Sequence, residues 1–495
     1  MPSHFEPTNA MNSASTAIRG FADAPVRRLL VLACIGALAA CHPSDILKVT
    51  DIDVARPESV SDSASLPALL DGAIGDFGVA YNGGGDFNQI TLSGQLADEL
   101  INTETFPTRI EVDERRQNFQ NNGSLRDIFY ATSQARASAD RATAGFLKFA
   151  PTSAGLSESL NLSALTYIIF AENYCGAVPI SSMDPATQEI TYGVPLSTTQ
   201  LLQVAVQKAD SALTIATSAN VAGSATYATQ QARLARIVKA RALLDMGQAT
   251  EAAAAIGGTA GVPSNFQYTY THSTTSGRQN NGTWGVTVSV GRFGVADKEG
   301  GNGLPFLTEG DTAQATKDPR VISGHRSNNK GNGFDGGTPQ WVQLKYPARD
   351  SKVVIADGVE ARLIEAEAQL KAGDYPGMLA TLNALRSDPS VLAVRGYAAG
   401  SLPPLPDVSA QGLTAEQNQL FSERAYWLYL TSHRLGDLRR LIRDYQRPAE
   451  TVFPTGAYVK YGVTSTYGTD VNSPIPQAEE NNPNFKRSSC STTTA

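Results

Sequence analysis

Apolar side chains recur at helical spacing along most of this chain. In residues 124–149 they are separated by steps of three, four and seven, the spacing of one face of an α-helix. The positions concerned are Leu125, Ile128, Phe129, Ala135, Ala139, Ala142, Phe146 and Phe149. We expect further helices over residues 58–80, 90–100, 157–174, 198–217, 229–256 and 414–444. The pattern therefore predicts a mostly α-helical protein.

Two stretches share the same order of small residues, leucine and glycine. Residues 240–247, with the sequence ARALLDMG, are matched at the same offsets by residues 366–373, with the sequence AEAQLKAG. In each stretch the glycine falls where one helix would turn into the next, and the small alanines let paired helices approach closely. This arrangement is typical of tetratricopeptide-like helical hairpins. The alternative is two unrelated hairpins of similar composition.

Residues 257–357 separate these two hairpins and interrupt the helical pattern. They are rich in Gly, Asn, Ser and Thr, with short β-like runs at 284–290 and 341–344. A segment of this length is too long for a plain loop in a compact domain, so it is either disordered or a functional insertion. Its aromatic residues favour an insertion. We expect one domain over residues 58–495 that carries it.

The first 40 residues have the pattern of a secretory signal. Arg27 and Arg28 precede an apolar run over residues 29–40, which is too short to span a membrane. The run ends in small residues directly before Cys41, and this order resembles the lipobox of bacterial lipoproteins, in which the cysteine is acylated. The alternative is an ordinary secretory signal followed by a chance cysteine.

The lipobox resemblance implies that the mature chain starts at a lipidated Cys41 and continues as a polar tether over residues 41–57. Its acyl chains would hold the protein on a membrane. No later segment approaches 18 continuous apolar residues, so we expect no transmembrane helix. His42 follows the cysteine where an aspartate would suggest the inner membrane, and by resemblance to lipoprotein sorting we expect the outer membrane.

The charge and the cysteines limit the possible partners and cross-links. The chain carries a net charge of −7 at pH 7, and a mildly acidic protein repels the phosphates of nucleic acids, so we expect no nucleic-acid partner. Cys34 leaves with the signal and Cys41 is lipidated. Cys175 and Cys490 remain, and they could pair in an oxidising compartment.

The sequence contains no recognisable catalytic or metal-binding motif. Its histidines are scattered without ligand spacing, and HExxH, CxxC, a phosphate-binding glycine loop and G-x-S-x-G are all missing. We predict that the protein is not an enzyme and holds no metal and no cofactor. A lipid-anchored hydrolase, with two carboxylates brought together only by the fold, stays open as an alternative.

The charged pattern of residues 414–444 resembles that of a known family. The SusD/RagB family of nutrient-binding outer-membrane lipoproteins has a C-terminal helix of the form E-R-x-x-E-L-x-x-E-G-x-R-x-x-D-L. The matching residues are Glu423, Arg424, Leu428, Arg434, Asp437 and Leu438. Three residues stand where two acids and a glycine are usual: Trp427, Thr431 and Ser432. The chain is therefore similar to a divergent member.

Other stretches resemble the same family, in the same order along the chain. They are residues 97–99, 171–180, 366–386 and 474–483. We expect the charged residues of these motifs to hold helices together through capping contacts and ion pairs, and the first two candidates are Asp98 and Glu99. The others are Glu423, Arg434 and Asp437, of which the last two have the spacing of a pair on one helix face.

The resemblance implies a SusD-like α-helical fold and a role in nutrient capture at the cell surface. The expected nutrient is an oligosaccharide or another small ligand, which would pass to a TonB-dependent outer-membrane β-barrel transporter, a SusC-like partner. The alternative is a helical-repeat outer-membrane lipoprotein that serves as a scaffold for another protein.

Aromatic residues in the insertion are the leading candidates for contact with a sugar ring. A sugar presents an apolar face to an aromatic ring and hydroxyl groups to polar side chains, and aromatic rings lose little entropy when they bind. The candidates in the insertion are Trp284 and Trp341, with Asn281 and Tyr346. In the family, ligand contacts also come from a loop that here covers residues 101–114, which offers Asn102, Phe106 and Arg109. The alternative for each aromatic residue is a small local core that pins the insertion.

Overall fold

The computed structural model describes residues 62–85, 87–184, 187, 189–311, 317–325 and 331–495. The predicted signal over residues 1–40, the lipidation site Cys41 and the tether over residues 41–57 lie outside these residues. Within the part of the chain that the structure describes, no helix is long and apolar enough to cross a membrane.

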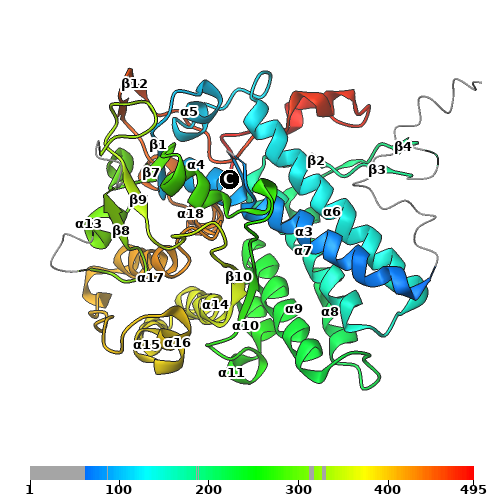
Figure 1. The fold of residues 1–495 in the computed structure, drawn as a ribbon. Coiled ribbons are helices and arrows are strands. Elements are labelled where there is room, and N and C mark those ends of the chain that lie inside the picture. The colour runs from blue at the N-terminus through cyan, green and yellow to red at the C-terminus, as the bar shows by residue number, and fades with distance from the viewer. Residues whose placement is uncertain (1–61, 86, 185–186, 188, 312–316, 326–330) are drawn as a thin grey trace, which may run out of the picture. The chain divides into compact units, whose positions relative to one another are not determined.

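The protein is mostly α-helical, as the apolar spacing predicts (Figure 1). The longer helices are α3 (Leu66–Asn82), α6 (Gly123–Phe149), α7 (Ala154–Asn173), α8 (Thr198–Ala216), α9 (Ala225–Asp245), α14 (Gly358–Lys371), α15 (Tyr375–Ser387) and α17 (Leu413–Trp427). The shorter ones are α4 (Gln89–Leu96), α5 (Pro107–Asp113), α10 (Ala249–Ile256), α11 (Gly258–Gly261), α12 (Gly282–Trp284), α13 (Phe306–Gly310), α16 (Pro389–Arg395) and α18 (Arg434–Arg443).

The strands are short and form separate antiparallel pairs. They are β1 (Leu100–Asn102) with β7 (Phe293–Val295), β6 (Gln267–Tyr270) with β10 (Val353–Asp357), β8 (Ser323–His325) with β9 (Trp341–Gln343), β11 (Ala457–Lys460) with β12 (Val463–Thr466), β2 (Val178–Pro179) with β5 (Pro195–Leu196), and β3 (Ser182–Met183) with β4 (Ile190–Thr191). The remaining helical turns include η5 (Glu299–Gly301) and η8 (Gln477–Asn481).

The long helices pack in sequence, each against the next. In this order the contacts run from α3 to α6, α7, α8, α9, α10, α14 and α15. The side chains of α7 are buried along its whole length, so this helix forms the centre of the array. The predicted apolar face of α6 is also correct, because its residues from Leu125 to Phe146 at helical spacing are buried. Burial of these faces supplies the main driving force for the fold.

The two predicted glycine corners are confirmed. Gly247 lies between α9 and α10, and Gly373 lies between α14 and α15. Their φ angles are 77° and 76°, in the left-handed region that glycine enters without steric cost. A residue with a Cβ would strain both turns, so the repeated glycine in the two similar stretches has a conformational cause.

The prediction of one continuous helix over residues 414–444 is wrong, because the chain forms α17 and α18 with a turn between them. Leu430 and Ser432 in this turn have φ angles of 51° and 65°. Side chains from distant segments bind the backbone of the turn: Tyr346 donates to the Leu430 carbonyl over 2.9 Å, and Tyr81 donates to the Thr431 carbonyl over 2.6 Å. Tertiary hydrogen bonds therefore replace the helical ones here.

Buried ion pairs join the C-terminal helices to the rest of the protein, as the charged motif residues predict. Arg434 Nε and Nη2 donate to the two carboxylate oxygens of Asp98 over 2.6 and 2.8 Å. Glu99 Oε1 accepts from the Leu430 N–H over 2.8 Å. The expected pairing of Arg434 with Asp437 is wrong, because Arg434 binds Asp98 while Asp437 binds other arginines.

The other two acids of the motif are also held by arginines. Asp437 accepts bonds from Arg424 and Arg440, at 2.9 and 2.7 Å. Glu423 binds Arg320 and Arg386, at 2.8 and 2.7 Å. Cys175 and Cys490 form a disulfide that ties the C-terminal segment to the residues that follow α7. The scaffold role that we predicted for the motif residues is confirmed.

We predict that Arg434→Met lowers the free energy of unfolding by about 3–5 kcal/mol, because it leaves the Asp98 carboxylate buried without its ionic partner. Chemical denaturation measures the change. The double variant Asp98→Asn with Arg434→Met removes both charges and should recover part of the loss. A single variant within about 1 kcal/mol of the natural protein would contradict the structural role of this pair.

Candidate functional site

Three of the predicted ligand contacts are used inside the protein. Tyr346 is buried, with its hydroxyl on the turn after α17. Asn281 is buried and caps α12, where its Oδ1 accepts from the Trp284 N–H over 2.9 Å. Asn102 is buried, and its Oδ1 accepts from the Glu104 N–H over 3.0 Å and from Lys460 Nζ over 2.7 Å. These three side chains bind backbone groups inside the protein and are therefore not available to a ligand.

The two tryptophans of the insertion are partly buried and pack against the core. Trp341 on β9 lies opposite His325 on β8, and the centroids of the two rings are 3.6 Å apart. Trp284 is the last residue of α12, the helix whose N-cap is Asn281. Both rings therefore contribute to packing, and a ligand could reach only part of each.

Phe106, the N-cap of α5, is placed differently, whereas Arg109 in the first turn of this helix is buried. Phe106 is 47% exposed, although most of the α5 residues that follow it are buried or half-buried. The guanidinium of Arg109 lies 4.7 Å from the centre of the Phe106 ring. Glu104 fixes the guanidinium, because both of its carboxylate oxygens accept from Arg109 Nη1, over 2.8 and 2.9 Å. The ring is thus held in place by a cation and stays open to solvent.

A second exposed ring stands beside the first. Phe334 is 50% exposed, and the guanidinium of Arg292 lies 5.1 Å from its ring centre and 5.5 Å from that of Phe106. One arginine therefore lies against both rings. We call Phe106, Phe334, Arg109 and Arg292 the arginine–aromatic cluster.

Backbone contacts fix the position of Phe334. Its N–H donates to the Gly291 carbonyl over 2.8 Å, and the next N–H, of Asp335, donates to the Thr103 carbonyl over 2.9 Å. Gly333 passes so close to Thr103 that a Cβ on it would lie 2.2 Å from the threonine side chain. The loop that carries Phe334 is thus hydrogen-bonded to, and packed against, the segment that leads from β1 to Phe106.

The turn between β11 and β12 covers the same segment from the C-terminal part of the chain. Lys460 Nζ binds the carbonyl oxygen of Glu104 as well as Asn102. The next residue, Tyr461, is 63% exposed, and its N–H donates to Thr338 Oγ1 over 3.0 Å. Its ring lies against Gly337, where a Cβ would be 2.1 Å away. Three exposed aromatic rings therefore come from three distant parts of the sequence.

The sequence prediction reached part of this cluster. Phe106 and Arg109 were among the candidates, whereas Phe334, Arg292 and Tyr461 were not. Phe334 lies in the turn Gly331-Asn-Gly-Phe-Asp-Gly-Gly337. A single aromatic residue among turn-forming residues is the only sequence signal that could indicate an exposed ring there. Nothing in the sequence around Tyr461 indicates that it comes close to residues 333–338.

A pair of buried carboxyl groups lies beneath the β11–β12 turn. Asp113 Oδ2 accepts from Tyr458 Oη over 2.7 Å and from the Asn102 N–H over 2.8 Å, and Glu299 Oε1 accepts from Tyr467 Oη over 2.8 Å. Asp113 and Glu299 also contact each other through their carboxyl groups. Among the described groups, no donor reaches Asp113 Oδ1 or Glu299 Oε2, and a proton on either acid would allow a hydrogen bond between them.

Burial raises the pKa of both acids. The pKa of Asp113 rises from 3.8 to about 6, because water is excluded from its carboxylate. The pKa of Glu299 lies well above its usual 4.5, first because of burial and then because of the charge of Asp113. The charge of Asp113 therefore changes near pH 6, beside strand β11, which carries Tyr458 and Lys460.

No protein-family model matches the sequence, and a search of curated proteins finds no match either. Solved structures do match. A SusD-like carbohydrate-binding protein from Bacteroides fragilis aligns with a TM-score of 0.60 at 14% identity, over 86% of this chain and 99% of that chain. Another SusD-like protein from Bacteroides fragilis gives 0.57 at 13% identity, over 86% and 96%.

A laminarin-binding SusD-like protein also aligns, with a TM-score of 0.51 at 14% identity, over 79% of this chain and 96% of that chain. These alignments cover nearly the whole length of the matched proteins. The chain therefore has the SusD-like fold, in a sequence that has diverged far from the solved examples. The fold expected from the sequence motifs is confirmed.

We predict that Asp113→Asn flattens the dependence of stability on pH. The folded pKa of Asp113, about 6, exceeds its unfolded value of 3.8, so the folded state binds more protons between these two values. The stability of the natural protein therefore falls as the pH rises through this window. Asparagine keeps an acceptor for Asn102 and Tyr458 and donates to Glu299.

The measured quantity is the unfolding free energy of the variant minus that of the natural protein. We expect it to rise by on the order of 2 kcal/mol between pH 4 and pH 8. Acids that do not contact Asp113 cancel in this difference, whereas Glu299 does not, because the charge of Asp113 raises the pKa of Glu299. A difference that does not change with pH would show that the two carboxyl groups are not linked in this way.

Proposed function

We propose that this protein captures an oligosaccharide through the arginine–aromatic cluster and passes it to a TonB-dependent outer-membrane transporter. The fold supports this function, because the matched solved structures include a carbohydrate-binding and a laminarin-binding SusD-like protein. The single observation that carries the proposal is the pair of half-exposed rings, Phe106 and Phe334, held against Arg292.

The cluster combines the two kinds of surface that a sugar ring needs. The exposed surface of the two phenyl rings suits the C–H groups of a pyranose. Phenylalanine side chains have only two rotatable bonds, so they lose little entropy on binding. Arg292, whose side chain is 16% exposed, can donate to a hydroxyl oxygen at the ring edge, whereas the buried Arg109 holds the Phe106 ring in place. Because arginines already lie against the rings, the aromatic surface is arranged before the ligand arrives, which lowers the cost of binding.

The membrane anchor and the transporter partner rest on the sequence. A lipidated Cys41 would keep the folded part close to the outer membrane through its tether, and surface attachment suits delivery to a barrel in the same membrane. The absence of catalytic motifs suits a protein that binds a glycan without cleaving it.

We predict that replacing both Phe106 and Phe334 by alanine weakens glycan binding by about 2 kcal/mol or more, because each ring face that packs on a sugar is lost. Affinity gels containing laminarin, starch or xylan find the polysaccharide that the natural protein retains, and calorimetry then measures the loss. Tyr130→Ala is the matched control, since Tyr130 is 42% exposed on α6. Equal retention of the double variant and the natural protein would refute this site.

We predict that Cys41→Ser abolishes membrane attachment. The natural chain should incorporate labelled palmitate and sediment with the outer membrane, whereas the variant should carry no label and appear in the soluble fraction. Glycan binding by the purified folded part should not change. Sedimentation of an unlabelled variant with the membrane would show that another feature attaches the protein.

A further inference from the structure

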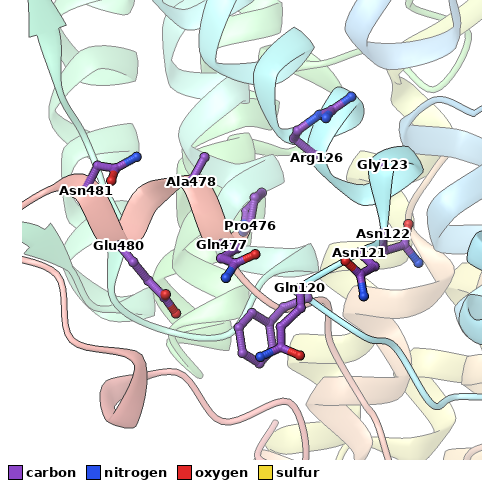
Figure 2. A pocket seen from close by; sticks show the side chains of 11 residues that line it. Gln120, Asn121, Asn122, Gly123, Arg126, Pro476, Gln477, Ala478, Glu480 and Asn481 are labelled. Carbon is purple, nitrogen blue, oxygen red and sulfur yellow. The ribbon is translucent and has the colours of Figure 1, made fainter.

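A groove of about 570 Å³ opens between the start of α6 and the C-terminal segment (Figure 2). One wall is formed by residues 119–123 and Arg126, and the other by η8 and the proline before it. The two walls are at least 350 residues apart in sequence. Residues 474–483 resemble a family motif, but no sequence signal marks either wall as a binding site.

Uncharged amide groups dominate its polar surface. The exposed amides are those of Gln120 and Asn121 on one wall and Gln477 and Asn481 on the other. Figure 2 shows amides from both walls around the space between them. In the described part of the chain, these four side chains make no hydrogen bond to the protein, so their donors and acceptors remain available. An amide both donates and accepts, which matches a hydroxyl group.

The charged residues of the groove are already paired. Arg126 donates to Asp127 over 2.7 Å, and Glu480 accepts from Arg487 Nε over 2.9 Å. A charged ligand would have to compete with these pairs, whereas a neutral ligand would not. Phe119, Pro476 and Ala478 add apolar surface between the amides. The combination of neutral hydrogen-bonding groups and apolar surface suits the edges and faces of a neutral sugar.

Arg487 holds the two walls together. Its guanidinium lies 4.0 Å from the centre of the Phe119 ring on the first wall. On the second wall it donates to the carbonyl oxygens of Ile475, over 2.6 Å, and Pro476, over 3.3 Å. The Cys175–Cys490 disulfide anchors the chain three residues further on. The width of the groove is therefore set in the absence of ligand, and little ordering is needed on binding.

The groove is also a neighbour of the arginine–aromatic cluster. Asn122 caps α6 and donates to the Thr108 carbonyl over 2.5 Å. Phe106 lies two residues before Thr108, which is at most about 8 Å of backbone. A chain of several sugar units that begins at the cluster has the length to reach the groove.

We propose that this groove is a second binding site for the same glycan, one that takes neutral sugar units beyond those held at the cluster. The inference rests on the proposed function and adds to it that affinity depends on chain length. Short oligosaccharides occupy the cluster alone. Longer neutral ones contact both sites, and the second contact is then intramolecular, which strengthens binding without requiring a tight groove.

The test uses laminarin, starch and xylan oligosaccharides of increasing length with the full mature chain. For the series that binds, we expect the affinity of the natural protein to increase about tenfold from the shortest to the longest members. Asn121→Ala with Gln477→Ala should remove most of this increase and leave the shortest members unaffected. Ala478→Trp, which fills the groove, should have the same effect. Gln203→Ala, an exposed amide on α8, is the matched control and should change nothing.

The outcomes separate the two proposals. If both groove variants follow the natural protein at every length, or if affinity does not increase with length, the groove is not a glycan site and the cluster is unaffected. If the natural protein binds none of the three series, the proposed function fails together with this inference.

Discussion

The buried contact between Asp98 and Arg434 is the constraint on which the rest of the structure depends. Removing a carboxylate and a guanidinium from water is costly, and only close pairing offsets that cost. The pair has this geometry, and the neighbouring Glu99 binds the turn before α18. Two segments more than 330 residues apart are thus fixed to each other at one point.

The position of this contact explains why the loop that carries Phe106 is well defined. Strand β1 follows directly after Glu99, and the loop that leads to Phe106 follows β1. The C-terminal helices, through Asp98 and Glu99, therefore fix the start of the segment that carries Phe106. Lys460, the last residue of β11, fixes the other side of this segment by binding Asn102. Loops that carry function need a rigid support of this kind, and here the helical array provides it.

The sequence predicted what depends on local periodicity and missed what depends on distant partners. The helices, the glycine corners at Gly247 and Gly373 and the structural role of the charged motif follow from spacing and residue type. The break between α17 and α18 does not, because Tyr81, Glu99 and Tyr346 cause it from far along the chain. Asn102 and Asn281 have the chemistry of ligand contacts, but buried backbone groups need the same hydrogen bonds, and sequence does not distinguish the two uses. Phe106 was recognised because it follows a family motif, whereas Phe334 needed the fold to bring it to the same arginine.

The C-terminal end of the chain is secured almost to its last residue. Beyond the disulfide at Cys490, the Val471 N–H donates to the Thr492 carbonyl over 2.7 Å, and Asn472 Nδ2 donates to the Thr494 carbonyl over 2.6 Å. Chain ends are usually where proteolysis begins, because they fray. Residues 491–494 are instead held by hydrogen bonds, and a protease would have to break these bonds before it could reach the wall of the groove. Protection of this segment against proteolysis uses no residue that lines the groove.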